Sequence, residues 1–142
     1  MHKDFYASGF LYNPKTQQIL LQQAKSADNN NEWVLFGAEH DKEETLKEKF
    51  LNFINELLNL NLKENAIFPV YDYTDKGKNV FIFYVHVKKL EKFNHKSKNF
   101  AWFTFKQVQK LGLSDQTKQD IIVSQRVIDS SIRKGLGERT IG

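Results

Sequence analysis

Residues 33–60 read WVLFGAEHDKEETLKEKFLNFINELLNL, and the pattern of apolar residues changes near the middle of this stretch. Four consecutive apolar residues at positions 33–36 end at Gly37, which is typical of a short strand that returns to the core. From Glu43 onward the apolar positions recur with helical spacing, so one side of a helix is apolar. These positions are Leu46, Phe50, Phe53, Ile54, Leu57 and Leu58.

The sequence before this helix contains residues that favour a helix start. Asp41 is a suitable N-cap, because its side chain can accept a hydrogen bond from a backbone amide of the first turn. Glu43 and Glu44 then fall in that first turn, near the positive end of the helix dipole. In this helix Phe53 and Leu57 lie close to the middle of the apolar arc, and Glu56 lies at its edge.

Strand-like segments flank the helix on both sides. Residues 5–12 and 19–21 are apolar and are separated by the turn signal Asn13-Pro14, so they predict a hairpin. Downstream, residues 66–71, 80–87 and 100–105 also predict strands. The segment 80–87 is apolar at nearly every position, which predicts a central place in the sheet. A short helix from Lys106 and a longer one from Asp115 to about Ile132 complete the pattern, with Ile121, Ile122, Gln125, Ile128 and Ile132 near one face of the longer helix.

This order of elements predicts one α+β domain, an α/β/α sandwich with a mixed sheet and packed helices. The chain has 142 residues, which is the length of a single domain. We expect the domain to span residues 1–132. Residues 133–142 show no periodicity and are expected to form a flexible C-terminal tail.

Composition excludes several classes of protein. The chain has no Cys, so disulfides, thiolate metal sites and a cysteine nucleophile are excluded. No apolar run resembles a signal peptide or a membrane span, and we expect a cytoplasmic protein. His40 and His95 have no partner at metal-ligand spacing, so no zinc site is predicted. His86 lies in an apolar strand, which indicates a hydrogen-bonded core histidine.

The basic residues limit how phosphate can be held. The chain has 18 Lys and 3 Arg, and Arg126, Arg133 and Arg139 all lie near its C-terminal end. Elsewhere phosphate must be held by Lys or by backbone amides. Residues 88–98 contain five Lys and one Glu, which is typical of a solvated loop. With only Phe93 and His95 interleaved, this segment makes nucleic acid an unlikely partner.

The segment 33–60 resembles the signature of the Nudix (MutT-like) hydrolases, a glycine-rich loop followed by a helix that presents several glutamates. The matching residues are Trp33, Leu35, Gly37, Glu44, Thr45, Ile54, Glu56 and Leu60. Other residue types stand at Phe36, Ala38, Asp41, Asn52, Phe53, Leu57 and Asn59, so the box is degenerate. A second register pairs Gly37 with Glu43 and again keeps Glu56 as its only matched helix glutamate. Residues 7–12, 19–23 and 102–108 are also similar to family members.

The resemblance implies Mg²⁺-dependent cleavage of a nucleoside diphosphate linked to another group. Glu56 and Glu44 are the candidate catalytic residues, and Glu56 is the candidate metal ligand. Mg²⁺ prefers several oxygen ligands, and a single carboxylate holds it weakly. Glu39, Glu43 and Glu48 are nearby acids that would replace the missing glutamates only if the loop geometry allows it. The plainer interpretation is that Glu56 is solvated and that Glu43 and Glu44 complement the helix dipole.

The sequence therefore supports three hypotheses. The first is a nucleotide-type ligand binder with weak or no hydrolysis, whose pocket lies between the sheet and the helix that follows Glu43. Its candidate ligand contacts are Trp33, Gly37, Tyr71 and Tyr73. Trp33 is equally compatible with a place in the core. The second is an active hydrolase that uses Mg²⁺ and non-standard acids. The third is a protein-interaction domain that exposes Phe53 and Leu57 as an apolar patch.

Overall fold

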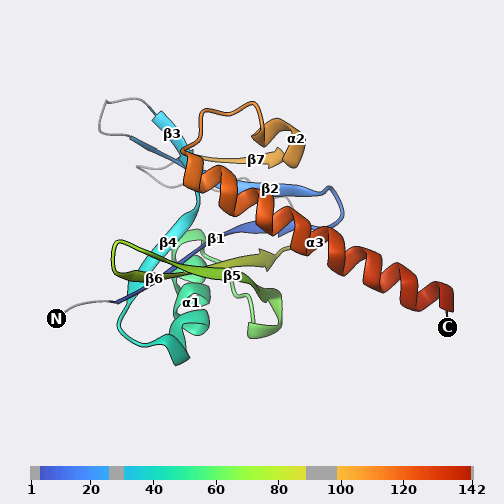
Figure 1. Ribbon diagram of the computed structural model, residues 1–142, viewed down its shortest axis with the longest axis horizontal. Coiled ribbons are helices and arrows are strands. Elements are labelled where there is room, and N and C mark those ends of the chain that lie inside the picture. The colour runs from blue at the N-terminus through green and yellow to red at the C-terminus, as the bar shows by residue number, and fades with distance from the viewer. Residues whose placement is uncertain (1–3, 26–30, 89–98, 142) are drawn as a thin grey trace.

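The computed structural model describes residues 4–25, 31–88 and 99–141, which form a seven-stranded sheet with helices on both faces (Figure 1). The strand order is β3-β2-β1-β6-β5, while β4 pairs with β1 and β7 pairs with β2. The strands are β1 (Phe5–Asn13), β2 (Gln18–Lys25), β3 (Asn31–Val34), β4 (Phe36–His40), β5 (Ile67–Asp75), β6 (Lys78–His86) and β7 (Phe100–Thr104). The helices are η1 (Glu43–Thr45), α1 (Leu46–Leu58), η2 (Glu64–Ala66), α2 (Phe105–Val108) and α3 (Asp115–Ile141). The α+β architecture expected from the sequence is confirmed.

The strand β6 lies in the interior of the sheet, as its continuous apolar sequence predicts. It pairs in parallel with β1, from Phe5↔Asn79 to Tyr12↔His86. On its other side it pairs antiparallel with β5. Its side chains enter both cores, Phe83 and Val85 on one face and Val80, Ile82 and Tyr84 on the other, which explains why its apolar residues do not alternate with polar ones.

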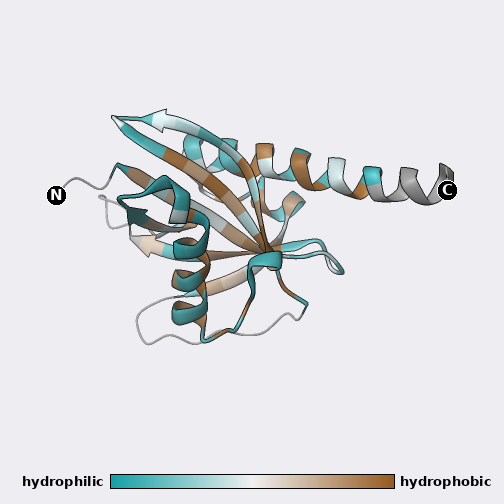
Figure 2. Ribbon diagram, turned by 90° about the horizontal axis from the view of Figure 1, so that it is seen from below, coloured by the Kyte–Doolittle hydropathy of each residue, from teal (hydrophilic) through white to brown (hydrophobic). Residues whose placement is uncertain are grey.

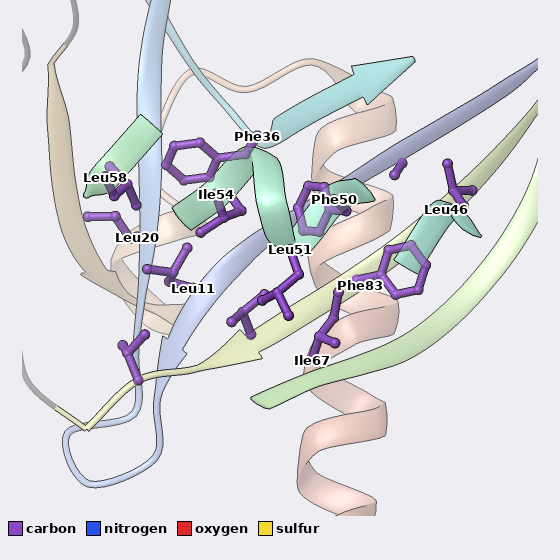
Figure 3. Close-up of a cluster of buried hydrophobic side chains, with 13 residues drawn as sticks. Leu11, Leu20, Phe36, Leu46, Phe50, Leu51, Ile54, Leu58, Ile67 and Phe83 are labelled. Carbon is purple, nitrogen blue, oxygen red and sulfur yellow. The ribbon is translucent and has the colours of Figure 1, made fainter. Parts of the chain in front are cut away.

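The two faces of the sheet carry separate cores. Because side chains alternate along a strand, β1 sends Ala7 and Leu11 to one face and Phe10 and Tyr12 to the other. The first face packs against α1, whose Leu46, Phe50, Leu51, Ile54 and Leu58 meet side chains of the strands (Figure 3). The second face packs against α3 through Ile121 and Ile128. Figure 2 shows the apolar strands between these two layers.

The start of α1 differs from the sequence expectation. A 3-10 turn, η1, precedes the helix, and Asp41 does not cap it. Thr45 immediately precedes α1, and its Oγ1 lies 2.6 Å from His40 Nε2 instead of accepting a helix amide. Asp41 Oδ1 lies 3.5 Å from the other nitrogen of the same imidazole. Both candidate capping side chains are thus engaged by His40, and this tertiary contact overrides the local capping preference.

The last helix is longer than its apolar spacing predicts. It ends at Ile141 and not near Ile132, and Figure 1 shows its C-terminal part extending beyond the sheet. Once a helix has formed, each further residue adds a hydrogen bond at low entropic cost, so the helix can continue past the packed region. Ile122 and Ile132, expected on the packed face, are 46% and 41% exposed. Among the described residues, no helix is long and apolar enough to cross a membrane.

The close pairing of β1 with β6 requires a residue without a side chain at Gly9, and this requirement can be tested. A Cβ at this position would lie 2.0 Å from the backbone oxygen of Phe83 and 3.3 Å from the Phe50 ring. Gly9→Ala is therefore expected to lower the free energy of unfolding by about 1–3 kcal/mol, because the two strands must separate locally. Urea unfolding would measure the change. Gly112→Ala is the matched control, since nothing lies within 4 Å of its added methyl. Equal midpoints for the two variants would contradict the close approach of β1 and β6.

Candidate functional site

The predicted catalytic glutamates lie on the surface and apart from other functional groups. Glu56 is exposed on α1, and Glu44 is exposed on the turn that precedes it. Within the described part of the chain, neither side chain has a hydrogen-bond or ion-pair partner. The predicted roles of Glu56 and Glu44 therefore gain no support from a neighbouring acid or base.

The apolar side of α1 is rotated relative to the expectation. Phe53 and Leu57, expected near the middle of the buried arc, are half-buried at its flank. The centre is occupied by Phe50, Leu51 and Ile54, of which Phe50 and Ile54 are fully buried. The reason is that the sheet meets α1 along the line from Leu46 to Leu58, and periodicity alone could not locate that line. Phe53 and Leu57 still pack against the same core and do not form a free apolar patch.

The side chains around Glu56 do not fit a bound Mg²⁺. Such an ion requires near-octahedral oxygen coordination, provided by carboxylates, substrate phosphates and water. Among the residues that the structure describes, no three His, Asp or Glu side chains are grouped so that they could hold a metal. Phe53, one turn before Glu56 on α1, and Leu57, the next residue, carry hydrocarbon side chains. No catalytic step through a metal follows from this arrangement.

A pocket of about 240 Å³ lies on the opposite face of the sheet, beneath the start of α3. Its aromatic walls are Tyr6 of β1 and Tyr73 of β5, and Ser8 and Leu35 also line it. The first turns of α3 contribute Gln116, Thr117 and Asp120. These turns are positioned by Ser114, whose Oγ accepts the Thr117 amide at 3.2 Å as an N-cap.

Asp120 is the central polar group of this pocket. It is only 4% exposed, and three donors bind its carboxylate. Tyr71 donates to Oδ1 at 2.6 Å, Gln116 donates to the same oxygen at 3.0 Å, and Tyr73 donates to Oδ2 at 3.2 Å. Burial raises the pKa of Asp120, and these hydrogen bonds oppose that rise. Burial also raises the pKa of both tyrosines, and the adjacent carboxylate raises it further, so both remain protonated donors.

The other predicted ligand contacts lie around this pocket in different ways. Tyr73 lines the pocket, whereas Tyr71 is not among its lining residues and donates a hydrogen bond to Asp120, which is. Gly37 is in contact with Tyr6, because a Cβ at Gly37 would lie 1.8 Å from the Tyr6 hydroxyl. Trp33 is half-buried and packs edge-on against Phe103, with the ring centroids 4.9 Å apart. The structure thus brings Tyr71 and Tyr73 together and places Trp33 in the core near the pocket.

Sequence reasoning missed Asp120 and its neighbours on α3. One signal for it was present, because Asp120, Ser124 and Ile128 are spaced four residues apart and therefore share a helix face. All three are buried. A carboxylate on a buried helix face must find donors, and this requirement would have singled out Asp120.

Comparisons with known proteins are informative at the level of three-dimensional structure. No family model matches the sequence, and no curated protein matches it. Among solved structures, a MutT/nudix family protein from Enterococcus faecalis superimposes with a TM-score of 0.66 at 16% identity, over 91% of this chain and 64% of that one. The NUDIX domain of Shewanella oneidensis NrtR, complexed with ADP ribose, gives 0.68 at 15% identity, over 90% of both chains. The C-terminal domain of mouse MUTYH, in a complex with human PCNA, gives 0.68 at 11% identity, over 88% and 89%.

The chain has a Nudix fold. The segment that resembles the Nudix signature begins on β3 and β4 and continues through α1, which covers one face of the sheet. The pocket around Asp120 lies on the other face of the same Nudix fold, under α3. The sheet therefore separates Glu56, the candidate catalytic residue on α1, from the candidate binding pocket around Asp120.

The hydrogen bond from Tyr71 to Asp120 can be tested through stability. Tyr71→Phe removes a donor from a buried carboxylate and should lower the free energy of unfolding by about 1–3 kcal/mol at neutral pH. Because this bond lowers the pKa of Asp120, its contribution is complete above that pKa and disappears as the pH falls through it. Urea unfolding at several pH values would measure the difference.

Tyr73→Phe is the comparison variant for this experiment. Its hydroxyl lies farther from the carboxylate, at 3.2 Å, so its removal should cost less. If Tyr71→Phe lowered the free energy of unfolding equally at every pH, the hydrogen bond to ionised Asp120 would not be the cause of the loss.

Proposed function

We propose that this chain binds a nucleotide-type ligand in the pocket around Asp120 and hydrolyses it weakly or not at all. The proposal depends on one observation, that a buried carboxylate held by three donors lines the pocket together with two aromatic side chains. The glutamates of α1 lie on the other face of the sheet and have no grouping that would hold a metal, within the described residues.

The lining of the pocket suits a nucleobase. Tyr6 and Tyr73 offer aromatic surface on which a base can pack. An ionised carboxylate has about four lone-pair positions, and three donors occupy positions on Asp120. One acceptor position therefore remains for a ring or exocyclic N–H of the ligand. Thr117 adds a hydroxyl at the same wall.

The size of the pocket indicates which part of the ligand it encloses. Sites that bury an entire drug-sized ligand have about 300–1,000 Å³, and this pocket is smaller. It would enclose the base and leave the sugar and phosphates outside. On the same face, Lys78 Nζ lies 2.5 Å from Glu39 Oε1, and this lysine is opposite Asp75 in the strand register. Lys78 is the cation that we place nearest the phosphates.

The solved structures support the class of ligand. The NrtR domain with the same fold was crystallised with ADP ribose, which combines a base with two phosphates. ADP-ribose is therefore the first probe for this chain. The two other hypotheses lack a specific observation in their favour, because Glu39 pairs with Lys78 and because Phe53 and Leu57 pack against the core.

Binding can be tested with a variant that fills the pocket. Thr117→Trp places an indole at the pocket wall and should weaken ADP-ribose binding about tenfold or more, because the base can no longer enter. Isothermal titration calorimetry would measure the dissociation constant, and thermal melting would confirm that the variant folds. Lys118→Trp is the control, since Lys118 is exposed and does not line the pocket. Equal affinity in both variants would place the ligand elsewhere.

The second test concerns hydrolysis. We expect the same dissociation constant with Mg²⁺ and with EDTA, because the pocket lies on the face away from α1. We also expect no formation of AMP from ADP-ribose above background, and no effect of Glu56→Gln. Chromatography of the reaction mixture would detect AMP. Mg²⁺-dependent turnover that Glu56→Gln abolishes would show that the chain is an enzyme and that the proposal is wrong.

A further inference from the structure

A second hollow, of about 550 Å³, lies at the opposite end of β1 from the Asp120 pocket. The Asp120 pocket contains Tyr6 and Ser8, from the first half of β1. The second hollow contains Pro14, which follows the end of β1, and His86, which ends the parallel strand β6. The two sites are thus separated by the length of the strand. The volume of the second hollow lies in the range of sites that enclose a small organic molecule.

Hydrogen bonds from side chains and from the backbone hold the walls of this hollow in place. Asn55 of α1 clamps the following loop, because its Nδ2 donates to the Leu62 oxygen at 3.0 Å and its Oδ1 accepts from the Leu62 amide at 2.8 Å. On the other side, the Val87 amide donates to the Tyr12 oxygen at 3.0 Å. The turn at Pro14 is fixed by Asn13, whose Oδ1 accepts from two backbone amides. The hollow is therefore largely formed before any ligand arrives.

The lining combines an apolar floor with positive charge. Leu60, Leu62 and Val87 provide hydrocarbon surface, and Lys63 and Lys88 provide two ammonium groups. No Asp or Glu is among its described lining residues, although the chain has 17 acidic residues. Neither lysine has a hydrogen-bond or ion-pair partner within the described part of the chain. The charge of the hollow is thus available to an anion.

Polar but uncharged groups complete the lining. Asn61 and Asn65 offer amide donors from the loop and from η2. The imidazole of His86 packs between Tyr12 and Phe68, with ring centroids at 5.9 and 4.6 Å. Burial lowers the pKa of His86, so it is neutral near pH 7 and the lysines carry the positive charge.

We propose that this hollow is a binding site for a small organic anion, with the apolar body on Leu60, Leu62 and Val87 and the carboxylate or phosphate head between Lys63 and Lys88. The site is distinct from the Asp120 pocket, and it does not depend on the function proposed for that pocket. Lysine binds a carboxylate or a phosphate as a point charge, so both head groups fit this site. The apolar floor selects against inorganic ions, which have no body to bury.

The test is a titration of ¹⁵N-labelled protein, followed by amide chemical shifts, with benzoate and with phenyl phosphate as probes. We expect saturable shifts at Leu62, Lys63, Val87 and Lys88 with at least one probe, and the comparison of the two identifies the preferred head group. Inorganic phosphate should bind more weakly than phenyl phosphate. The double variant Lys63→Gln/Lys88→Gln should weaken binding about fivefold, as expected for the loss of two solvent-exposed ion pairs.

The matched control is Lys106→Gln/Lys110→Gln, which changes the net charge equally at exposed lysines outside the hollow. It should leave the affinity unchanged, and so should Thr117→Trp in the other pocket. Absence of saturable shifts at millimolar probe would overturn the proposal, as would equal weakening by both double variants. Equal affinity for inorganic and phenyl phosphate would also overturn it, because the apolar floor would then contribute nothing.

The same double variant separates this proposal from the one for the Asp120 pocket. Lys63→Gln/Lys88→Gln should leave the affinity for ADP-ribose unchanged, so either proposal can fail without the other.

Discussion

The parallel pairing of β1 with β6 organises both halves of the molecule. Every residue of β1 from Ala7 to Asn13 is buried, and the strand also pairs with β2 and β4. Because the strand is covered on both faces, it supports one core under α1 through Ala7 and Leu11 and another under α3 through Phe10 and Tyr12. Gly9 permits the two backbones and the Phe50 ring to approach each other closely. The separation of α1 from the Asp120 pocket is a direct consequence of this two-sided sheet.

The two faces of the sheet differ in whether they bury an acidic side chain. On the α1 side, the half-buried side chains of Phe53 and Leu57 pack against the core. Hydrocarbon at these positions contributes to burial and offers nothing to a cation. On the α3 side, a carboxylate is buried at an energetic cost that its three donors offset. Perturbed acids of this kind concentrate at functional sites, which supports a binding role for the α3 face.

The distribution of positive charge is consistent with this division. Neither pocket has an arginine among its described lining residues. The nearby cations are lysines, which contact an anionic ligand group as point charges and not through two parallel hydrogen bonds. Lys78 is engaged with Glu39 beside the first pocket, whereas Lys63 and Lys88 have no such partner in the described residues. The Asp120 pocket is therefore suited to binding a polar ligand through hydrogen bonds, and the second hollow is suited to binding a negatively charged group.

Local sequence determined the elements, because apolar periodicity reports which residues alternate on a strand or share a helix face. It predicted the β1–β2 hairpin, the central place of β6 and the helix that becomes α1. It could not predict that Asp41 and Thr45 contact His40, or that Leu51 and not Phe53 faces the sheet, because both depend on how α1 is placed. Tyr73 could be named as a candidate ligand contact, although the pocket that it lines is under α3 and not between the sheet and α1, where the ligand was expected. Asp120 could not be placed beside Tyr73. The two are far apart in the chain, and only the packing of α3 on β5 brings their side chains within hydrogen-bond distance.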